Sequence, residues 1–117
     1  MTKKEYMAFH KDCCERMVSI TQAKNADYSG SGDDPFANFR HVANFVQTKE
    51  LDMVAVGFLT RMSDKFSRIG SFISNGTLQV KDESVLDTLL DLANYSVLMA
   101  GYLSERRNAE KSLVKPE

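Results

Sequence analysis

The clearest pattern of apolar positions in this chain lies between residues 83 and 103. Apolar side chains recur there every three or four residues, the spacing of one helical face: Leu86, Leu89, Leu90, Ala93, Val97 and Ala100. Val85, Leu92, Met99 and Leu103 widen this face. The polar residues form a narrow stripe on the remaining side: Glu83, Ser84, Asp87, Asp91, Asn94 and Tyr95. A helix that is apolar on most sides is usually buried, and its carboxylates then need a cation, a metal or a hydrogen-bond network.

The same period predicts three further helices. The first covers residues 3–25, with Thr2 as its cap and one apolar face made by Tyr6, Phe9, Cys13, Met17 and Ile20. The second is short and covers residues 35–47, with Asp34 as N-cap and Pro35 at the first helical position. The third begins near residues 48–51 and runs to about residue 74. Its expected core face is Ala55, Phe58, Leu59, Met62, Phe66, Ile69 and Ile73.

The segments between these helices carry turn signals. Residues 25–34 contain two glycines and predict a loop, and residues 74–76 (Ser-Asn-Gly) predict a helix stop. Leu78 to Val80 suggest a short extended stretch, after which Asp82 is expected to cap the fourth helix, which continues to about residue 107. We therefore predict one all-α domain over residues 1–117, a bundle of four helices with an ordered core at residues 3–107 and a fraying tail at 108–117.

Composition and charge narrow the classes of function. The chain has 117 residues, 43% of them hydrophobic, and a formal net charge of -1, so it has no overall field that would attract nucleic acid or an anionic membrane. Cys13 and Cys14 are adjacent, which disfavours a bridge between them and indicates reduced thiols in a cytoplasmic setting. No apolar run approaches the roughly 20 residues of a membrane span, and the cysteines and histidines have no zinc-binding spacing.

Two stripes of charge fall on consecutive helices. The third helix carries Arg61, Asp64, Lys65 and Arg68, and the fourth carries Glu83, Asp87 and Asp91. One interpretation is a structural salt-bridge network between antiparallel neighbours. The other is a nucleotide site, in which Asp87 and Asp91, one turn apart, share Mg²⁺ while the basic residues hold phosphate.

Two residues near the end of the first helix also have alternative interpretations. Lys24 suits the negative end of the helix dipole, but it is also placed to bind a ligand. Tyr28 is a large aromatic residue in a small, polar segment, where it either closes the edge of the core or stacks on a ligand.

Four segments together resemble the first nucleotide-modification-associated domain, a small family found mostly in phages. Residues 24–30 read Lys-Asn-Ala-Asp-Tyr-Ser-Gly, with Ser29 where the family has Gly, and residues 36–39 read Phe-Ala-Asn-Phe. Residues 61–68 match an Arg-x-x-Asp-Lys-x-x-Arg helix, and residues 83–95 match Glu-Ser-x-x-Asp-Thr-Leu-x-Asp-Leu-Ala-Asn-Tyr throughout. The resemblance covers about residues 20–100 and implies a role beside nucleotide or base modification.

A more distant similarity is to the MazG-like all-α nucleoside triphosphate pyrophosphohydrolases, which use a Glu-x-x-Asp metal pair and oligomerise to complete their site. Asp91 matches the Asp of that pair, but Thr88 stands where its Glu would be, with Asp87 one residue earlier. The other metal-binding helix of those enzymes carries Glu pairs, whereas this chain has a largely basic helix there. This departure favours phosphate binding over Mg²⁺-dependent hydrolysis.

The first interpretation is therefore a small cytoplasmic nucleotide-binding protein of phage type, a homo-oligomer with its site near a subunit boundary. It sequesters a linear or cyclic nucleotide or a nucleotide signal, or acts in nucleotide modification. Its candidate nucleotide-binding residues are Lys24, Asp27, Tyr28, Arg61, Lys65 and Arg68. Residues that would hold Mg²⁺ or orient the cations are Asp64, Glu83, Asp87, Asp91 and Asn94. The alternatives are a metal-dependent nucleotide pyrophosphohydrolase and a non-catalytic helical scaffold in which the charges only neutralise each other.

Overall fold

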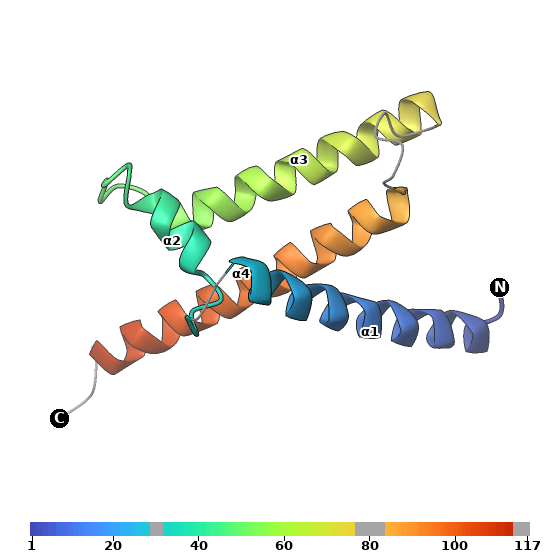
Figure 1. Cartoon of the computed structure of the whole chain (residues 1–117), viewed down its shortest axis with the longest axis horizontal. Helices are drawn as coiled ribbons and strands as arrows, with labels where there is room; N and C mark the ends of the chain where they lie inside the picture. Colours follow the sequence, from blue (N-terminus) through green and yellow to red (C-terminus); the bar gives the residue numbers. More distant parts are fainter. Residues whose placement is uncertain (29–31, 77–83, 114–117) are drawn as a thin grey trace.

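The predicted all-α fold is confirmed by a computed structural model (Figure 1). It describes the backbone of residues 1–28, 32–76 and 84–113, and the side chains of these ranges except 25–28 and 111–113. Three long helices, α1 (Lys3–Tyr28), α3 (Met53–Asn75) and α4 (Val85–Leu113), accompany the short helix α2 (Ala37–Ala43). The described ranges contain no strand, and the expected extended stretch at Leu78 to Val80 lies outside them.

Capping side chains explain where the long helices begin. At α1, Thr2 and Glu5 form a reciprocal capping box, with Glu5 N–H donating to Thr2 Oγ1 at 3.1 Å. Asp52 caps α3 by accepting hydrogen bonds from the backbone N–H groups of Val54 and Ala55, both at 3.1 Å. Gly76, at φ +76°, ends α3 in the left-handed conformation that glycine adopts easily, as residues 74–76 predicted.

The fourth helix also begins with a capping box. Ser84 Oγ accepts from Asp87 N–H at 3.1 Å and donates to Asp87 Oδ2 at 2.9 Å. The cap expected at Asp82 lies outside the described residues.

Several predicted boundaries were wrong. Helix α1 runs through residues 25–28, which were expected in a loop, because glycine first appears at residue 30. Helix α4 continues beyond residue 107 to Leu113, into the expected tail, where Arg106 and Glu110 pair at 3.5 Å one turn apart. A tail without Gly or Pro before Pro116 can extend the helix.

The second helix is shorter than the predicted residues 35–47. Asp34 caps a turn rather than the helix: its Oδ1 accepts from Phe36 N–H at 2.9 Å, and Ala37 N–H donates to Asp34 O at 3.2 Å. Helix α2 therefore starts at Ala37. After Ala43 the chain continues in turns, in which Phe45 N–H donates to Val42 O at 3.1 Å.

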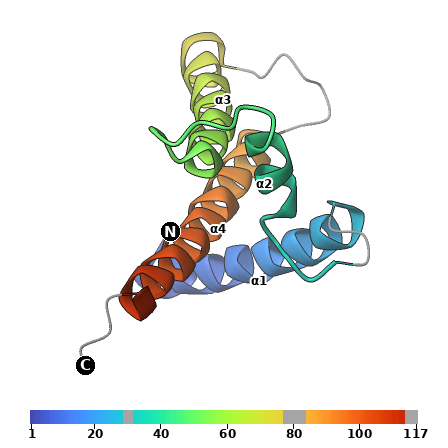
Figure 2. The same ribbon diagram turned by 90° about the vertical axis from the view of Figure 1, so that its left-hand side faces the viewer.

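Helices α3 and α4 run antiparallel along one another, as the short connection between them predicted (Figure 1). Helix α2 packs on α3. Helix α1 packs on α4 but crosses it instead of running alongside, as the view turned by 90° also shows (Figure 2). None of the helices in the described ranges is long and apolar enough to cross a membrane.

An aromatic cluster forms the core where α2, α3 and α4 meet. It consists of the buried residues Phe36, Val54, Phe58 and Tyr102, with Phe39 stacked on Phe58 at a ring-centroid distance of 4.0 Å. Gly57 makes room for this stack, because a Cβ there would lie 3.1 Å from Phe39 Cδ1. On α4, Thr88 and Leu90 are also buried.

The apolar faces of the long helices are less buried than expected. On α3 only Phe58 of the predicted core face is buried, while Leu59, Phe66 and Ile73 are exposed. Leu89, Val97 and Leu103 are exposed on α4, whose apolar sides were expected to be buried, and so are Tyr6 and Phe9 on α1. Periodicity identified these faces correctly as apolar, but the chain has too few neighbouring elements to cover them all.

The cap residue Asp52 also connects α3 to α4. Both its carboxylate oxygens accept from the Tyr102 hydroxyl, at 3.0 and 2.9 Å, and Arg106 pairs with Oδ2. Burial alone would raise the pKa of Asp52. The hydrogen bonds from Ala55 N–H and Tyr102 and the charge of Arg106 outweigh it, and they hold this pKa below its ordinary value of 3.8.

We therefore expect Asp52→Asn to lower stability in a pH-dependent way. A carboxyl whose pKa is depressed by folding stabilises the native state above its unfolded pKa, and this contribution is lost as pH falls through the folded pKa. Asparagine keeps the capping oxygen but not the charge. Urea unfolding should show the variant less stable than the parent at about pH 7, with the difference closing below pH 3.8. A difference that stays constant across that range would contradict the assignment.

Candidate functional site

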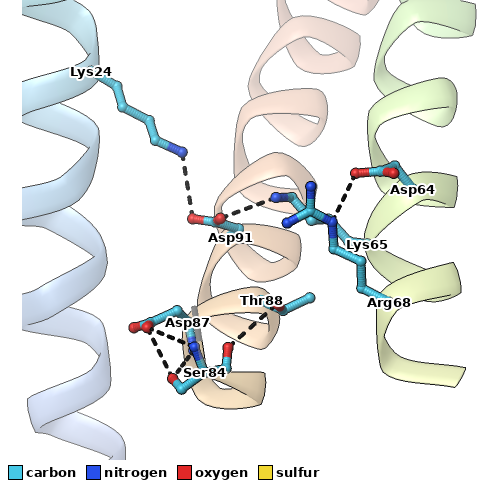
Figure 3. Close-up of polar contacts among 8 residues, drawn as sticks. All are labelled: Lys24, Asp64, Lys65, Arg68, Ser84, Asp87, Thr88 and Asp91. Carbon is cyan, nitrogen blue, oxygen red and sulfur yellow. Dashed lines mark hydrogen bonds and ion pairs between the residues drawn. The ribbon is translucent and has the colours of Figure 1, made fainter. Parts of the chain in front are cut away.

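Asp91, in the N-terminal third of α4, lies between two lysines from different helices (Figure 3). Its Oδ1 is 3.4 Å from Lys24 Nζ of α1, and its Oδ2 is 3.2 Å from Lys65 Nζ of α3. One carboxylate therefore ties all three long helices together. The Asp91 and Lys65 side chains are only 18% and 13% exposed, whereas Lys24 is 41% exposed.

Asp87 lies one turn earlier on α4 and makes separate contacts. It faces α1, where Arg16 is 3.6 Å from Oδ1, while its Oδ2 belongs to the capping box with Ser84 (Figure 3). The hydrogen bonds from Ser84, and then the charge of Arg16, lower the pKa of Asp87. The two carboxylates that were proposed to share Mg²⁺ are thus each held by their own cations. Within the described ranges no group of three or more His, Cys, Asp or Glu side chains could hold a metal ion.

The basic residues of α3 likewise contact different partners. Lys65 reaches Asp91, whereas Arg68 pairs along its own helix with Asp64, Nε to Oδ2 at 3.3 Å. Arg61, one turn before Lys65, lines a cavity. Among the described residues, the predicted opposition between the two charged stripes is present at the Lys65–Asp91 pair.

The cavity has a volume of about 280 Å³ and lies between the C-terminal part of α1, the start of α2, and the middle of α3 and α4. Its polar lining consists of Thr21, Lys24, Asn38, Arg61, Asp91 and Asn94. Its apolar lining includes Phe36, Phe39, Tyr95, Val97 and Leu98. Pockets that take small molecules have this combination of an apolar wall and a few convergent polar groups, and this one is at the small end of their size range.

Residues on the cavity wall hold one another in place. Lys24 Nζ lies 5.8 Å from the centroid of the Tyr95 ring, within reach of a cation–π interaction. Asn94 Nδ2 donates to Met17 O of α1 at 3.3 Å, which fixes α1 against α4 beside the cavity. These two contacts and the Lys24–Asp91 pair position the cationic end of the cavity.

Four of the candidate residues from the sequence line this cavity: Lys24, Arg61, Asp91 and Asn94. Lys65 contacts it through Asp91, while Asp64, Asp87 and Arg68 are not part of its lining. The side chains of Asp27 and Tyr28, and the whole of Glu83, lie outside the described residues. Sequence reasoning missed Asn38, although the Phe-Ala-Asn-Phe segment of the family resemblance was a signal for it.

The fold and the cavity define a class of protein: a small all-α protein with a cationic pocket between its helices. Comparison of the chain with protein-family models, with curated proteins and with solved structures gives no match. The function therefore has to be inferred from the geometry of the pocket.

We expect Asp91→Asn to destabilise the ligand-free protein, because Lys24 and Lys65 then both lose the carboxylate that lies between them. Removing one partner of a fully buried pair costs about 3–5 kcal/mol, and an exposed pair contributes about 0–1 kcal/mol. The intermediate burial of Asp91 suggests a loss of roughly 1–3 kcal/mol. Urea unfolding at a fixed protein concentration measures it.

Asp64→Asn is the matched control. Asp64 is 59% exposed, and within the described ranges it pairs with Arg68 of its own helix, so we expect little change. Equal effects of the two substitutions would show that the Asp91 contacts do not tie the helices together.

Proposed function

We propose that the cavity binds a nucleotide, with its phosphate near Lys24 and Arg61 and its base against the aromatic wall. The observation that supports this most strongly is the charge of the lining: two cations, Lys24 and Arg61, and one carboxylate, Asp91. Arg61 forms no ion pair with any residue in the described ranges, whereas Lys24 already has Asp91. A guanidinium that forms no ion pair within the described ranges, at the wall of a pocket that also has aromatic surface, is well suited to an anion.

Phosphate matches these donors better than a carboxylate ligand does, because it offers several oxygens at once. Arginine binds phosphate oxygens through two parallel N–H donors, and lysine adds a mobile point charge. Lys24 and Arg61 approach the cavity from different helices, α1 and α3, so that they can contact different oxygens of one ligand.

The rest of the lining suits a nucleobase or a ribose. Phe36, Phe39 and Tyr95 provide aromatic surface, and stacking of a base on such side chains contributes about 1–3 kcal/mol. Asn38 and Thr21 provide hydrogen-bond donors and acceptors for the polar edge of a base. The family resemblance of residues 20–100 points to the same class of ligand.

Binding without hydrolysis is the activity that we propose, with sequestration of the nucleotide as its consequence. Asp91 is neutralised by two lysines, and Asp87 by Arg16 and the hydrogen bonds of Ser84, so neither is an open ligand for a catalytic cation. Metal-dependent pyrophosphohydrolysis would need at least one of these carboxylates to leave its partners.

Arg61→Ala should remove nucleotide binding without destabilising the ligand-free protein, because Arg61 has no ion-pair partner to leave behind in the described chain. A nucleotide at about 100 times its dissociation constant should stabilise the parent by roughly 2.7 kcal/mol, which thermal melts without added magnesium would detect. Arg107→Ala, which removes an exposed arginine of α4 outside the cavity lining, is the control and should keep the full shift. Equal shifts for both variants, or none for the parent, would count against the proposed site.

The bound nucleotide should remain intact. After long incubation of a nucleoside triphosphate with the protein and magnesium, chromatography should recover the triphosphate unchanged. Magnesium-dependent conversion to a monophosphate and pyrophosphate, lost in Asp91→Asn, would instead identify the protein as a pyrophosphohydrolase.

A further inference from the structure

Helix α3 has its most apolar side beside the face that packs against α4, with three of its residues half-buried and three exposed. The residues of this side, called here the outer stripe, are Ala55, Leu59, Met62, Phe66, Ile69 and Ile73. They recur at alternating intervals of four and three residues, the spacing of a coiled-coil seam. The side of α3 that packs against α2 and α4 carries Val54 and Phe58 but also Arg61 and Lys65.

The largest members of the outer stripe are mostly accessible to solvent. Leu59 and Phe66 are each 60% exposed, and Ile73 is 76% exposed. Helix α3 forms one edge of the molecule in both views, with open space on the side away from α4 (Figures 1 and 2). A continuous apolar strip of this length on the surface marks an interaction site.

The shape of the chain indicates that a partner is needed to complete its core. The Cα radius of gyration is 17.4 Å, whereas a compact domain of this length has a radius of about 13 Å. Few large apolar side chains of the described ranges are fully buried, and all but one of the buried apolar residues lie in the aromatic cluster. Subunits of obligate oligomers have this character, since their interfaces resemble a domain core divided between two chains.

We propose that the outer stripe binds the outer stripe of a second copy of this chain, with the two α3 helices antiparallel and a two-fold axis near Phe66. The stripe is nearly palindromic about this residue: Leu59 precedes Phe66 by two turns and Ile73 follows it by two turns, with Met62 and Ile69 between. An antiparallel pair therefore places Leu59 against Ile73 of the second copy, and Phe66 against its own equivalent. Such self-complementarity is what a two-fold interface requires.

The residues beside the stripe also favour a second copy. Ser63, Ser67, Gly70 and Ser74 form its flank away from Lys65, and neither the stripe nor this flank carries a charge. Two copies can therefore approach without repulsion, and there is no charge pattern that would select a different partner.

Gly70 independently indicates that a second α3 helix packs closely against this flank. Glycine weakens the interior of a helix, and a Cβ added at Gly70 would meet no heavy atom within 4 Å. Packing within the described ranges therefore does not require a glycine at this position. Close packing of the backbone of a second α3 along this flank would require one.

The mass in solution tests the proposal, in the absence of nucleotide, so that its outcome is separate from that of the proposed function. Light scattering behind size exclusion should give an even multiple of the chain mass of 13.2 kDa for the parent. Phe66→Glu should halve that mass while circular dichroism shows unchanged helix content. Phe45→Glu, at a position 78% exposed on the turn after α2, is the control and should leave the mass unchanged. A parent that is monomeric, or a folded Phe66→Glu with the parental mass, would overturn the proposal.

Cross-linking tests the antiparallel geometry without a charge in the interface. In chains with Cys13 and Cys14 replaced by serine, Leu59→Cys and Ile73→Cys should each remain uncross-linked alone under mild oxidation. An equimolar mixture that has been unfolded and refolded together should give the disulfide-linked heterodimer. Cross-linking of either variant with itself, or no cross-linking in the mixture, would contradict the antiparallel pairing.

Discussion

The arrangement of the long helices depends on one carboxylate that is shared by two lysines. Asp91 receives Lys24 from α1 and Lys65 from α3, while α2 reaches α4 through the aromatic cluster. A carboxylate with a single cation would tie α4 to only one neighbour. The double contact positions α1 against the α3–α4 pair, and the cavity lies at the junction that results.

The same contact sets the electrostatics of the cavity. Because Asp91 is engaged by both lysines, it does not repel an incoming anion as an isolated carboxylate would. Arg61 also lines the cavity, and it forms no ion pair within the described ranges. The structural interpretation and the functional interpretation of the charged stripes are therefore compatible: Lys65 and Asp91 hold the helices, and Arg61 is the residue that we propose for a ligand.

The helices and their caps could be predicted because they depend on residues close together in sequence. The period of apolar residues identified α1, α3 and α4, and Thr2 and Gly76 mark helix ends where they were expected. The limits of α1 and α4 were missed because residues 25–28 and 108–113 contain no residue that stops a helix, so that nothing local distinguishes a frayed end from an ordered one.

The neighbours of each face could not be predicted in the same way. The sequence showed that Phe58, Leu59 and Phe66 lie on an apolar side of α3, but a helical period does not say which of them meets α4 and which meets solvent. The cavity was harder still, since it combines Lys24, Phe36, Arg61 and Asp91 from four segments whose contacts exist only after folding. Residue type nevertheless pointed to Lys24, Arg61 and Asp91, because charges on apolar helices need partners.

Calorimetric titration of a matched pair of ligands tests the central claim most directly: a nucleoside and its 5′-phosphates, added to the same protein without magnesium. Our account predicts measurable binding of the phosphorylated forms, weaker at higher salt, and a large loss of affinity when the phosphate is absent, because Arg61 and Lys24 would contact that group. Equal affinity for nucleoside and nucleotide, or no heat with any phosphorylated form, would contradict it.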